Sequence, residues 1–182
     1  FIHPFDDPLV IAGQGTVAKE IVEQTKHVPD IFFIPVGGGG LISGMSLYLK
    51  DKYPDSKVIG VESEDAPTLH TSLKYGKPKS LEQVGLFVDG CAVKKIGNET
   101  FRLAKKYVDE VVLVSIDETC AAIKDIYEDT RVMSEPAGAL SVAGMKKYII
   151  QHNINNKVIF AVNSGANLNF DRLRHVVERA EI

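Results

Sequence analysis

The residues most suggestive of chemistry are four consecutive glycines: Gly37, Gly38, Gly39 and Gly40. They follow an apolar run and precede a segment with helical spacing. Each ordered glycine costs roughly 0.5 to 1 kcal/mol relative to alanine, so the run costs on the order of 2 to 4 kcal/mol unless the backbone requires it. Without side chains, successive N–H groups can converge on one anion at the start of a helix. We therefore predict a phosphate-binding loop, since a plain strand-to-helix turn needs only one glycine.

Two nucleotide-binding motifs do not fit this loop. A dinucleotide fingerprint starting at Gly39 has Leu41 where its middle glycine should be, and the other starts fail as well. A nucleoside-triphosphate loop would place Lys and Ser or Thr after Gly44, where the chain has Met45 and Ser46. Glu62 stands where a dinucleotide-binding protein has the acid that binds a ribose, but without the fingerprint it is weak evidence for a nucleotide site. The phosphate is predicted to belong to something other than a nucleotide.

A second polar segment, residues 163–167, follows the last apolar run of the chain. Its Ser164 hydroxyl can donate to or accept from a ligand at the end of a strand. Alternatively, Ser164 or Asn167 is the N-cap of the following helix, and the local sequence does not separate these two interpretations. The Gly-x-Ser-x-Gly pattern of hydrolases is absent.

Strand-like and helix-like segments alternate along the chain and must position these two loops. Apolar, β-branched runs that are typical of strands buried on both faces span residues 30–36, 57–61, 111–114 and 157–162. Helical spacing spans residues 16–27, 41–52, 99–107, 118–130, 136–150 and 168–181. This alternation predicts an α/β fold with a mostly parallel sheet flanked by helices, and ligands at the carboxyl ends of its strands. Residues 62–97 are expected to form a long irregular excursion with short helical pieces.

Composition narrows the class of protein. The 182 residues carry 21 Lys and Arg against 24 Asp and Glu, and 45% are apolar. This balance disfavours nucleic-acid partners, and no run is long enough to span a membrane. Cys91 and Cys120 fit neither a disulfide framework nor a zinc site, which favours a reducing compartment. Residues 1–182 are expected to form an incomplete portion of a single domain, with no second domain in this chain. The protein is expected in the cytoplasm or, if a leader preceded Phe1, in an organelle.

Several motifs together resemble one enzyme family. They are Phe1 to Pro8, Ile11 to Thr16, Pro35 to Leu41, Val84 to Gly90, Glu128 to Arg131, Glu135 to Leu140 and Ser164 to Arg174. In this order they resemble biosynthetic threonine dehydratases, which are fold type II pyridoxal-phosphate enzymes. The resemblance covers nearly the whole chain and implies that it is the larger, later part of a cofactor-binding domain.

The resemblance implies a role for each loop. The glycines 37–40 and Leu41 would hold the 5′-phosphate of pyridoxal 5′-phosphate, and the Ser164 hydroxyl would bind the pyridine nitrogen. The parent enzyme would convert the amino acid L-threonine to 2-oxobutanoate and ammonia, a step toward isoleucine, and would be a homo-oligomer, a dimer or a tetramer. No metal site is predicted, because Thr68 stands where relatives with a cation beside Glu62 and Glu64 carry an acid.

The family's catalytic lysine, which carries the cofactor as a Schiff base, is missing from the chain. It belongs to a Ser-Phe-Lys-like motif about a hundred or more residues before the glycine loop, whereas only 36 residues precede Gly37. We therefore expect no catalytic residue in this chain and no activity from it alone. The alternatives are a serine racemase or serine dehydratase-like enzyme, and a phosphate-binding module without catalysis.

Other polar residues receive simpler interpretations. The five histidines are scattered and expected in surface or packing roles. Asp89 faces the substrate or belongs to a turn, and Arg172 and Arg174 are expected on a solvated helix face. Glu135 with Pro136 is expected to start a helix. Finally, Gly44 lies one turn into a helix, so Gly44→Ala is expected to be milder than Gly39→Asp.

Overall fold

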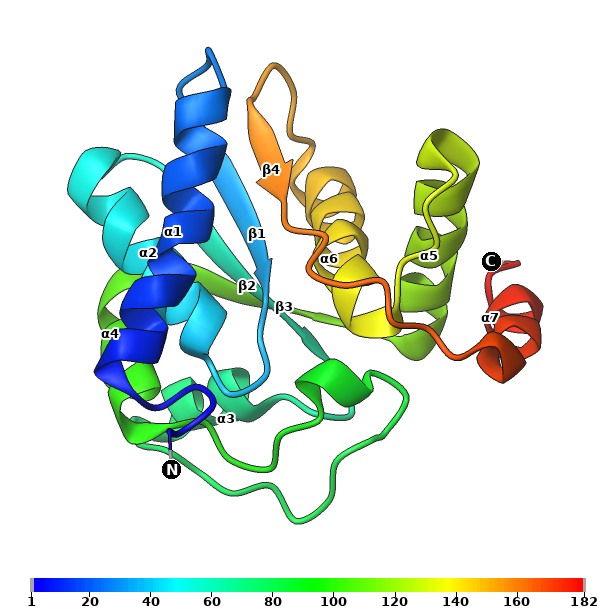
Figure 1. Ribbon diagram of the computed structural model, residues 1–182, viewed down its shortest axis with the longest axis horizontal. Coiled ribbons are helices and arrows are strands. Elements are labelled where there is room, and N and C mark those ends of the chain that lie inside the picture. Colours follow the sequence, from blue (N-terminus) through cyan, green and yellow to red (C-terminus); the bar gives the residue numbers. More distant parts are fainter. Residues whose placement is uncertain (1, 182) are drawn as a thin grey trace.

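Four parallel strands form one sheet in the order β3-β2-β1-β4 within residues 2–181, the part of the chain that this computed structural model describes (Figure 1). Phe1, the first residue of the N-terminal motif, lies outside that part. The strands are β1 Ile31–Pro35, β2 Lys57–Ser63, β3 Glu110–Val114 and β4 Ile159–Ala161. In register, Phe33 of β1 lies opposite Ile59 of β2 and Ala161 of β4. The predicted α/β class with a parallel sheet is confirmed.

Helices cover both faces of this sheet (Figure 1). One side carries α1 (Pro8–Gln24), α2 (Gly40–Lys52) and α4 (Asn98–Tyr107), and the other carries α5 (Ile116–Thr130) and α6 (Pro136–His152). Helix α7 (Leu173–Arg179) packs against α5, and α3 (Thr68–Tyr75) follows β2. Two short 3₁₀ turns complete the order, η1 at Asp89–Cys91 and η2 at Phe170–Arg172. The α/β layering is therefore the one that alternating elements require.

Strand β1 lies at the centre of two apolar cores because its side chains alternate between the faces. Phe32 and Ile34 pack with α2 in one core, whereas Ile31 and Phe33 pack with α6 in the other. The prediction that all strands are buried on both faces is wrong for the two edge strands, β3 and β4. Every residue of β4 is half-buried and only Val112 and Val114 of β3 are buried, because each of these strands pairs with one neighbour within the described residues.

The predicted boundaries of two helices are wrong. Helix α1 ends at Gln24 instead of His27. It begins at Pro8 instead of Thr16, because the Asp7 side chain accepts hydrogen bonds from Leu9 N at 2.8 Å and Val10 N at 3.4 Å. An N-cap aspartate followed by proline at the first helical position is a strong start signal. The last helix, α7, is shorter than the predicted 168–181, since residues 162–169 have no regular structure.

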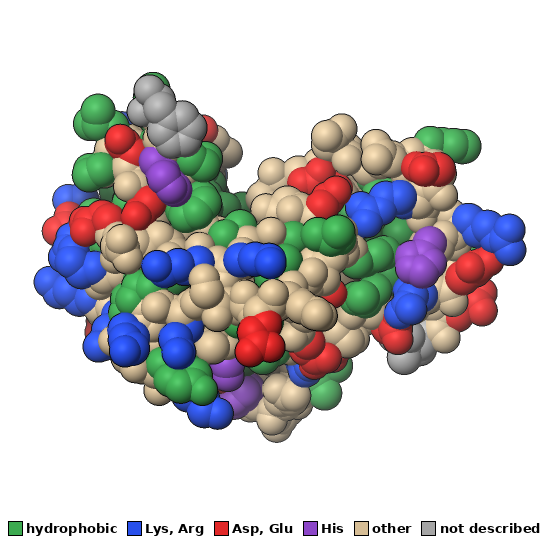
Figure 2. All heavy atoms as spheres, turned by 90° about the horizontal axis from the view of Figure 1, so that it is seen from below, with side chains coloured by type: hydrophobic (Ala, Val, Ile, Leu, Met, Phe, Trp, Pro, Cys, Tyr) green, Lys and Arg blue, Asp and Glu red, His purple; other side chains and the backbone are tan. Residues whose placement is uncertain are grey.

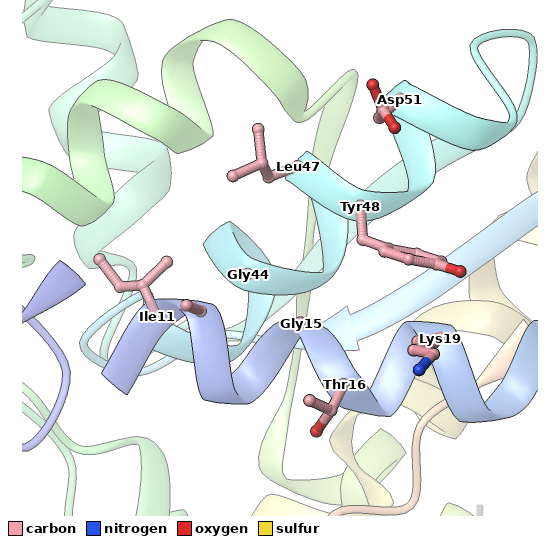
Figure 3. Close-up of a pocket in the computed structure, with 9 residues that line it drawn as sticks. Ile11, Gly15, Thr16, Lys19, Gly44, Leu47, Tyr48 and Asp51 are labelled. Atoms are coloured by element: carbon pink, nitrogen blue, oxygen red, sulfur yellow. The ribbon is translucent and has the colours of Figure 1, made fainter. Parts of the chain in front are cut away.

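Helices α1 and α2 cross in close contact where each contributes a glycine (Figure 3). A Cβ added to Gly44 would lie 2.2 Å from Ile11 O and 2.6 Å from Gly15 N. A Cβ added to Gly15 would lie 3.0 Å from Gly44 O. The position of Gly44 one turn into a helix is therefore no reason to expect a mild Gly44→Ala, because the atoms that the new Cβ would meet are backbone atoms of the neighbouring helix; whether it is milder than Gly39→Asp stays a prediction.

The predicted excursion lies between β2 and α4 and contains α3, η1 and an antiparallel bridge from Ser80 to Lys95. No helix in the described part of the chain is long and apolar enough to cross a membrane. Acidic and basic side chains are interspersed over the face seen in Figure 2. The two cysteines are buried and unpaired.

Candidate functional site

A cavity of 350 Å³ lies beyond the carboxyl ends of β1 and β4. In the sheet, β1 lies between β2, which follows it in the chain, and β4, which comes last. The strand order therefore reverses between β1 and β4, where the cavity lies. Open α/β sheets bind their ligands at such points. The cavity is lined by Pro4, Phe5, Gln14, Pro35, Gly37, Gly38, Gly39, Gly40, Leu41, Gly90, Cys91, Val93, Glu135, Ala137 and Ser164. All six residues predicted to bind a cofactor therefore line one cavity.

Three other surface grooves are larger, at 420 Å³ between α1 and α2 (Figure 3), 500 Å³ between α5 and α7 and 400 Å³ between α5 and α6. None of them contains any of the six predicted residues. Volume alone is a weak guide, because a binding site also needs converging polar groups. The smaller cavity has them.

The glycine loop offers a row of unused backbone donors. Among the described residues, the N–H groups of residues 37–42 donate no hydrogen bond, and the first donor of α2 is Ser43 N to Gly39 O at 3.0 Å. Gly38, Gly39 and Gly40 are buried, and unpaired buried N–H groups are rare in native proteins because each costs free energy. An anion bound in the cavity would satisfy them, so the loop fits a phosphate group.

Gly39 has a φ of 91°, a left-handed conformation that only glycine adopts readily. A Cβ there would lie 3.0 Å from both Cβ and Oγ1 of Thr100 and 3.1 Å from Ile96. The loop is therefore closed underneath by the N-terminal end of α4, and any other residue type at this position would force Thr100 and Ile96 to shift by a few tenths of an ångström.

Side chains from two helices hold the loop carbonyls. Thr100 Oγ1 donates to Gly38 O at 2.8 Å, and Gly97 N makes a longer bond to the same oxygen at 3.4 Å. Thr68 Oγ1 lies 3.3 Å from Gly37 O. The contact of Thr100 was not predicted from the sequence, and Thr68 was considered only for a cation site. No local signal predicts either contact, because the partners are 62 and 31 residues apart in the chain.

The N-terminal segment forms another wall of the cavity. Asp6 caps α4 by accepting from Asn98 N, Glu99 N and Thr100 N at 2.9, 2.8 and 3.1 Å, while its neighbour Asp7 caps α1. Phe5 directly precedes these two caps in the chain, and a Cβ at Gly38 would lie 2.3 Å from its ring. Sequence reasoning did not identify Phe5 as a cavity residue. Two adjacent aspartates before a proline were the available signal for a fixed segment.

Ser164 lies on the opposite rim with few contacts. Its side chain is exposed, and Ser164 Oγ reaches Ala137 O at 3.5 Å. The alternative that Ser164 or Asn167 caps the following helix is wrong. Helix α7 begins at Leu173, and its N-cap residue makes no side-chain hydrogen bond. Instead, Asn167 N donates to Glu135 Oε2 at 3.0 Å, which ties this loop to the start of α6.

Glu62 is the most perturbed carboxyl group of the site region. It is fully buried at the end of β2, and burial raises its pKa to about 7. Hydrogen bonds from Leu69 N, His70 N and Thr68 Oγ1, at 2.7, 2.8 and 3.0 Å, oppose this rise. Glu62 therefore caps α3 and does not line the cavity, unlike a ribose-binding acid. No metal-binding cluster of His, Cys, Asp and Glu occurs among residues 2–181.

Cys91 lines the cavity but is a poor nucleophile. Burial raises the pKa of its thiol, and the carboxylates of Glu62, Glu135 and Asp89 add to this rise, which brings the pKa to about 12. The reactive thiolate is therefore scarce near neutral pH.

Asp89 does not line the cavity. Its Oδ1 accepts from Gly90 N at 2.9 Å, as a turn requires, and its Oδ2 pairs with Arg172 Nη1 at 3.4 Å. Arg172 also donates to Leu86 O at 3.2 Å and lies over the Phe87 ring. The expectation of a solvated Arg172 is therefore wrong, whereas Arg174 is exposed as predicted. Pro136 begins α6 as expected, with Glu135 as its N-cap.

The chain belongs to the family of pyridoxal-phosphate dependent enzymes, whose family model matches residues 1–165. It is 56% identical over 182 residues to "L-threonine dehydratase biosynthetic IlvA" of Pasteurella multocida, a match that covers 100% of this chain and 35% of that relative. The chain thus spans about a third of the length of the curated relatives it matches.

Two solved structures are similar over nearly the whole chain. The processed form of threonine deaminase isoform 2 from Solanum lycopersicum has a TM-score of 0.96 at 44% identity, covering 98% of this chain and 49% of that chain. The serine racemase from Dictyostelium discoideum has a TM-score of 0.83 at 34% identity, covering 93% and 54%. The similarity is therefore greater to the deaminase than to the racemase.

Proposed function

We propose that this chain is the later part of the cofactor domain of a threonine ammonia-lyase, which converts L-threonine to 2-oxobutanoate and ammonia. The observation that carries the proposal is the cavity whose glycine loop presents unused N–H donors opposite Ser164. The identity to threonine dehydratases of other organisms supports the choice of substrate. Such an enzyme would serve isoleucine synthesis.

In this proposal, Gly37, Gly38, Gly39, Gly40 and Leu41 hold the 5′-phosphate of pyridoxal 5′-phosphate, which when bound withdraws electrons from the amino acid's α-carbon. The loop supplies neutral N–H donors and the positive end of the α2 dipole, both of which favour a phosphate dianion. Phe5 and the buried backbone exclude water from one side of the phosphate. The proposal assigns no metal to the site.

Ser164 is proposed to contact the pyridine nitrogen with its hydroxyl. A hydroxyl at this position does not hold a proton on that nitrogen as a carboxylate would, so the electron withdrawal stays moderate. Moderate withdrawal favours loss of the β-hydroxyl over reactions that need a longer-lived carbanion. The exposed Ser164 side chain is free to turn toward a ligand in the cavity.

No lysine is among the residues that line the cavity. The lysine that carries the cofactor and moves the α-proton is therefore proposed to come from another segment of the same protein, as are the contacts that would make a dimer or tetramer. A reducing compartment, the cytoplasm or an organelle matrix, suits the two buried free thiols.

The test compares the full-length protein that carries this chain with residues 1–182 alone, both supplied with pyridoxal 5′-phosphate and L-threonine. We expect 2-oxobutanoate from the full-length protein only, together with the visible absorbance of a lysine-bound cofactor. Turnover by residues 1–182 alone would contradict the assignment of the lysine to another segment.

A second candidate is a serine racemase, which the similarity to the Dictyostelium structure favours. The same assay decides between them if L-serine is offered beside L-threonine and the products are separated by chirality. D-serine as the main product would select the racemase. A full-length protein that binds the cofactor without any turnover would select the third possibility, a non-catalytic phosphate-binding module.

A further inference from the structure

Two threonines hold the glycine loop from the side opposite the cavity. Thr100 of α4 and Thr68 of α3 are both fully buried, and neither lines the cavity. Their hydroxyls reach the carbonyl oxygens of Gly38 and Gly37, at 2.8 and 3.3 Å. Each threonine therefore contacts the backbone of the loop and no part of the space that a ligand would fill.

A carbonyl that is held in place also determines where the next N–H points. All described peptide bonds are trans, and a trans peptide is planar with its C=O and N–H on opposite sides. Gly38 O points toward Thr100 of α4, so the N–H of Gly39, in the same peptide group, points away from α4. By the same geometry, the bond from Thr68 to Gly37 O turns the N–H of Gly38 away from α3. Both N–H groups belong to the unused donors of the loop.

We propose that Thr100 and Thr68 are positioning residues, which aim the N–H groups of Gly39 and Gly38 at the cofactor phosphate. The inference rests on the proposed function and assigns a role to residues that never touch the ligand. A run of glycines is free to rotate its peptide planes, so a loop without these two bonds would have to order its donors when the phosphate arrives. The threonines supply that order beforehand.

Thr100 is held more firmly against the loop than Thr68. Its N–H donates to Asp6 Oδ1 at 3.1 Å and its carbonyl accepts from Ser43 Oγ at 3.0 Å, so the residue is held on both sides. Thr68 has one hydroxyl proton for two acceptors, Gly37 O at 3.3 Å and Glu62 Oε1 at 3.0 Å. When Glu62 is ionised it is the better acceptor. We therefore expect Thr100 to contribute more to phosphate binding than Thr68.

The experiment uses the full-length protein with its cofactor removed, titrated with pyridoxal 5′-phosphate and separately with pyridoxal, which lacks the phosphate. For Thr100→Val, which has the same shape without the hydroxyl, we expect roughly 5- to 100-fold weaker binding of the phosphate form, with pyridoxal binding changed by less than about twofold. Thr100→Ser keeps the hydroxyl and should restore most of the affinity. The bound phosphate should also shift its ³¹P resonance in the valine variant.

A matched control is Thr119→Val in α5. Thr119 is equally buried and donates to Ser115 O at 2.9 Å, but it lies outside the site. It should lower thermal stability without changing the ratio of the two affinities. If Thr100→Val does not fold, Thr68→Val tests the same ratio with a smaller expected effect.

The outcomes separate this inference from the proposed function. If the unaltered protein binds no pyridoxal 5′-phosphate, the proposed function is wrong. If it binds the cofactor and Thr100→Val weakens both ligands equally, or weakens neither, only the positioning role is overturned. A loss confined to the phosphate form and reversed by serine supports the role.

Discussion

The two loops of the candidate site differ in how firmly the chain holds them. The segment after β1, residues 36–44, which comprises the glycine loop and the first turn of α2, is almost entirely buried, and hydroxyls from α3 and α4 contact two of its carbonyls. The loop after β4, residues 162–169, is largely exposed, and its Ser164 hydroxyl has one contact at 3.5 Å. The phosphate end of the proposed site is thus preorganised by the chain itself, whereas the ring end is open.

This difference teaches where substitutions should matter most. Preorganised donors lose their value when a single atom is misplaced, because they carry no freedom to adjust. An exposed hydroxyl can change partners at little cost. We expect large effects from changes in and under the glycine loop and a smaller, chemical effect from changes at Ser164.

The largest expected effect is that of Gly39→Asp in the full-length protein. The new side chain would project toward Thr100, under the loop, and a carboxylate about 8 Å from a phosphate dianion would cost about 4 kcal/mol at an effective dielectric constant near 20, or roughly 1,000-fold in cofactor affinity. Gly39→Asn is the matched control, since asparagine tolerates the φ of 91° and has the same shape without the charge. Cofactor titration should find the asparagine variant much less impaired. If the two variants bind the cofactor with equal affinity, the phosphate does not bind at the glycine loop.

Next in size is Gly44→Ala, which acts under the loop by forcing α1 and α2 apart. Overpacking costs about 1 to 3 kcal/mol, and we expect the upper end because the new Cβ would lie 2.2 Å from the backbone oxygen of Ile11. The control is Gly13→Ala on α1, which has nothing within 4 Å and should gain about 0.5 to 1 kcal/mol. Thermal unfolding of the two variants should shift in opposite directions. A stable Gly44→Ala would show that the helices can separate freely.

The same contrast explains how much of the molecule the sequence predicted. The glycine run, the strand before it and the rim position of Ser164 follow from local patterns, because apolar runs and turn residues act on their neighbours. The start of α1 was missed although Asp7 and Pro8 announce it. The glycines at 13 and 15 weakened the helical pattern.

Contacts between distant segments could not be predicted. The close approach of Gly15 and Gly44, the ring of Phe5 against Gly38, and the bonds of Thr68 and Thr100 each depend on how helices pack. A single sequence carries no periodicity that marks such pairs. The exposure of β4 was missed for a similar reason, since its residues are as apolar as those of the central strands.

A smaller effect, on the pH dependence of stability, is expected from Glu62. Its carboxylate shares the Thr68 hydroxyl with the carbonyl of Gly37 in the loop. Its pKa of about 7 in the fold exceeds the ordinary value of 4.5, so the folded state binds the proton more tightly than the unfolded state. The free energy of unfolding should therefore fall as pH rises from 4.5 to 7, by on the order of 2 to 3 kcal/mol from this group. The nearby Cys91 thiol stays protonated over that range and does not contribute.

Glu62→Gln removes this titration. We expect the difference in unfolding free energy between the unaltered protein and the variant to change over pH 4.5 to 7 and to be constant above and below. Chemical denaturation at a series of pH values measures it. A difference that is independent of pH would mean that Glu62 is ionised throughout and that its three hydrogen bonds outweigh its burial.

The smallest effect on binding, and the most informative on chemistry, is expected at Ser164. Ser164→Ala should leave phosphate anchoring intact and lower turnover roughly 5- to 10-fold, because a single hydrogen bond contributes about 1 kcal/mol. Ser164→Asp should instead hold a proton on the pyridine nitrogen, strengthen electron withdrawal and divert threonine from elimination toward racemisation or transamination. The measurement is the ratio of 2-oxobutanoate to D-allothreonine and pyridoxamine phosphate in the full-length protein. Full turnover by the alanine variant, together with an unchanged product ratio for the aspartate variant, would place the ring contact on another residue. The open loop after β4 would then have no part in the chemistry, and the contrast between the two loops would be one of exposure alone.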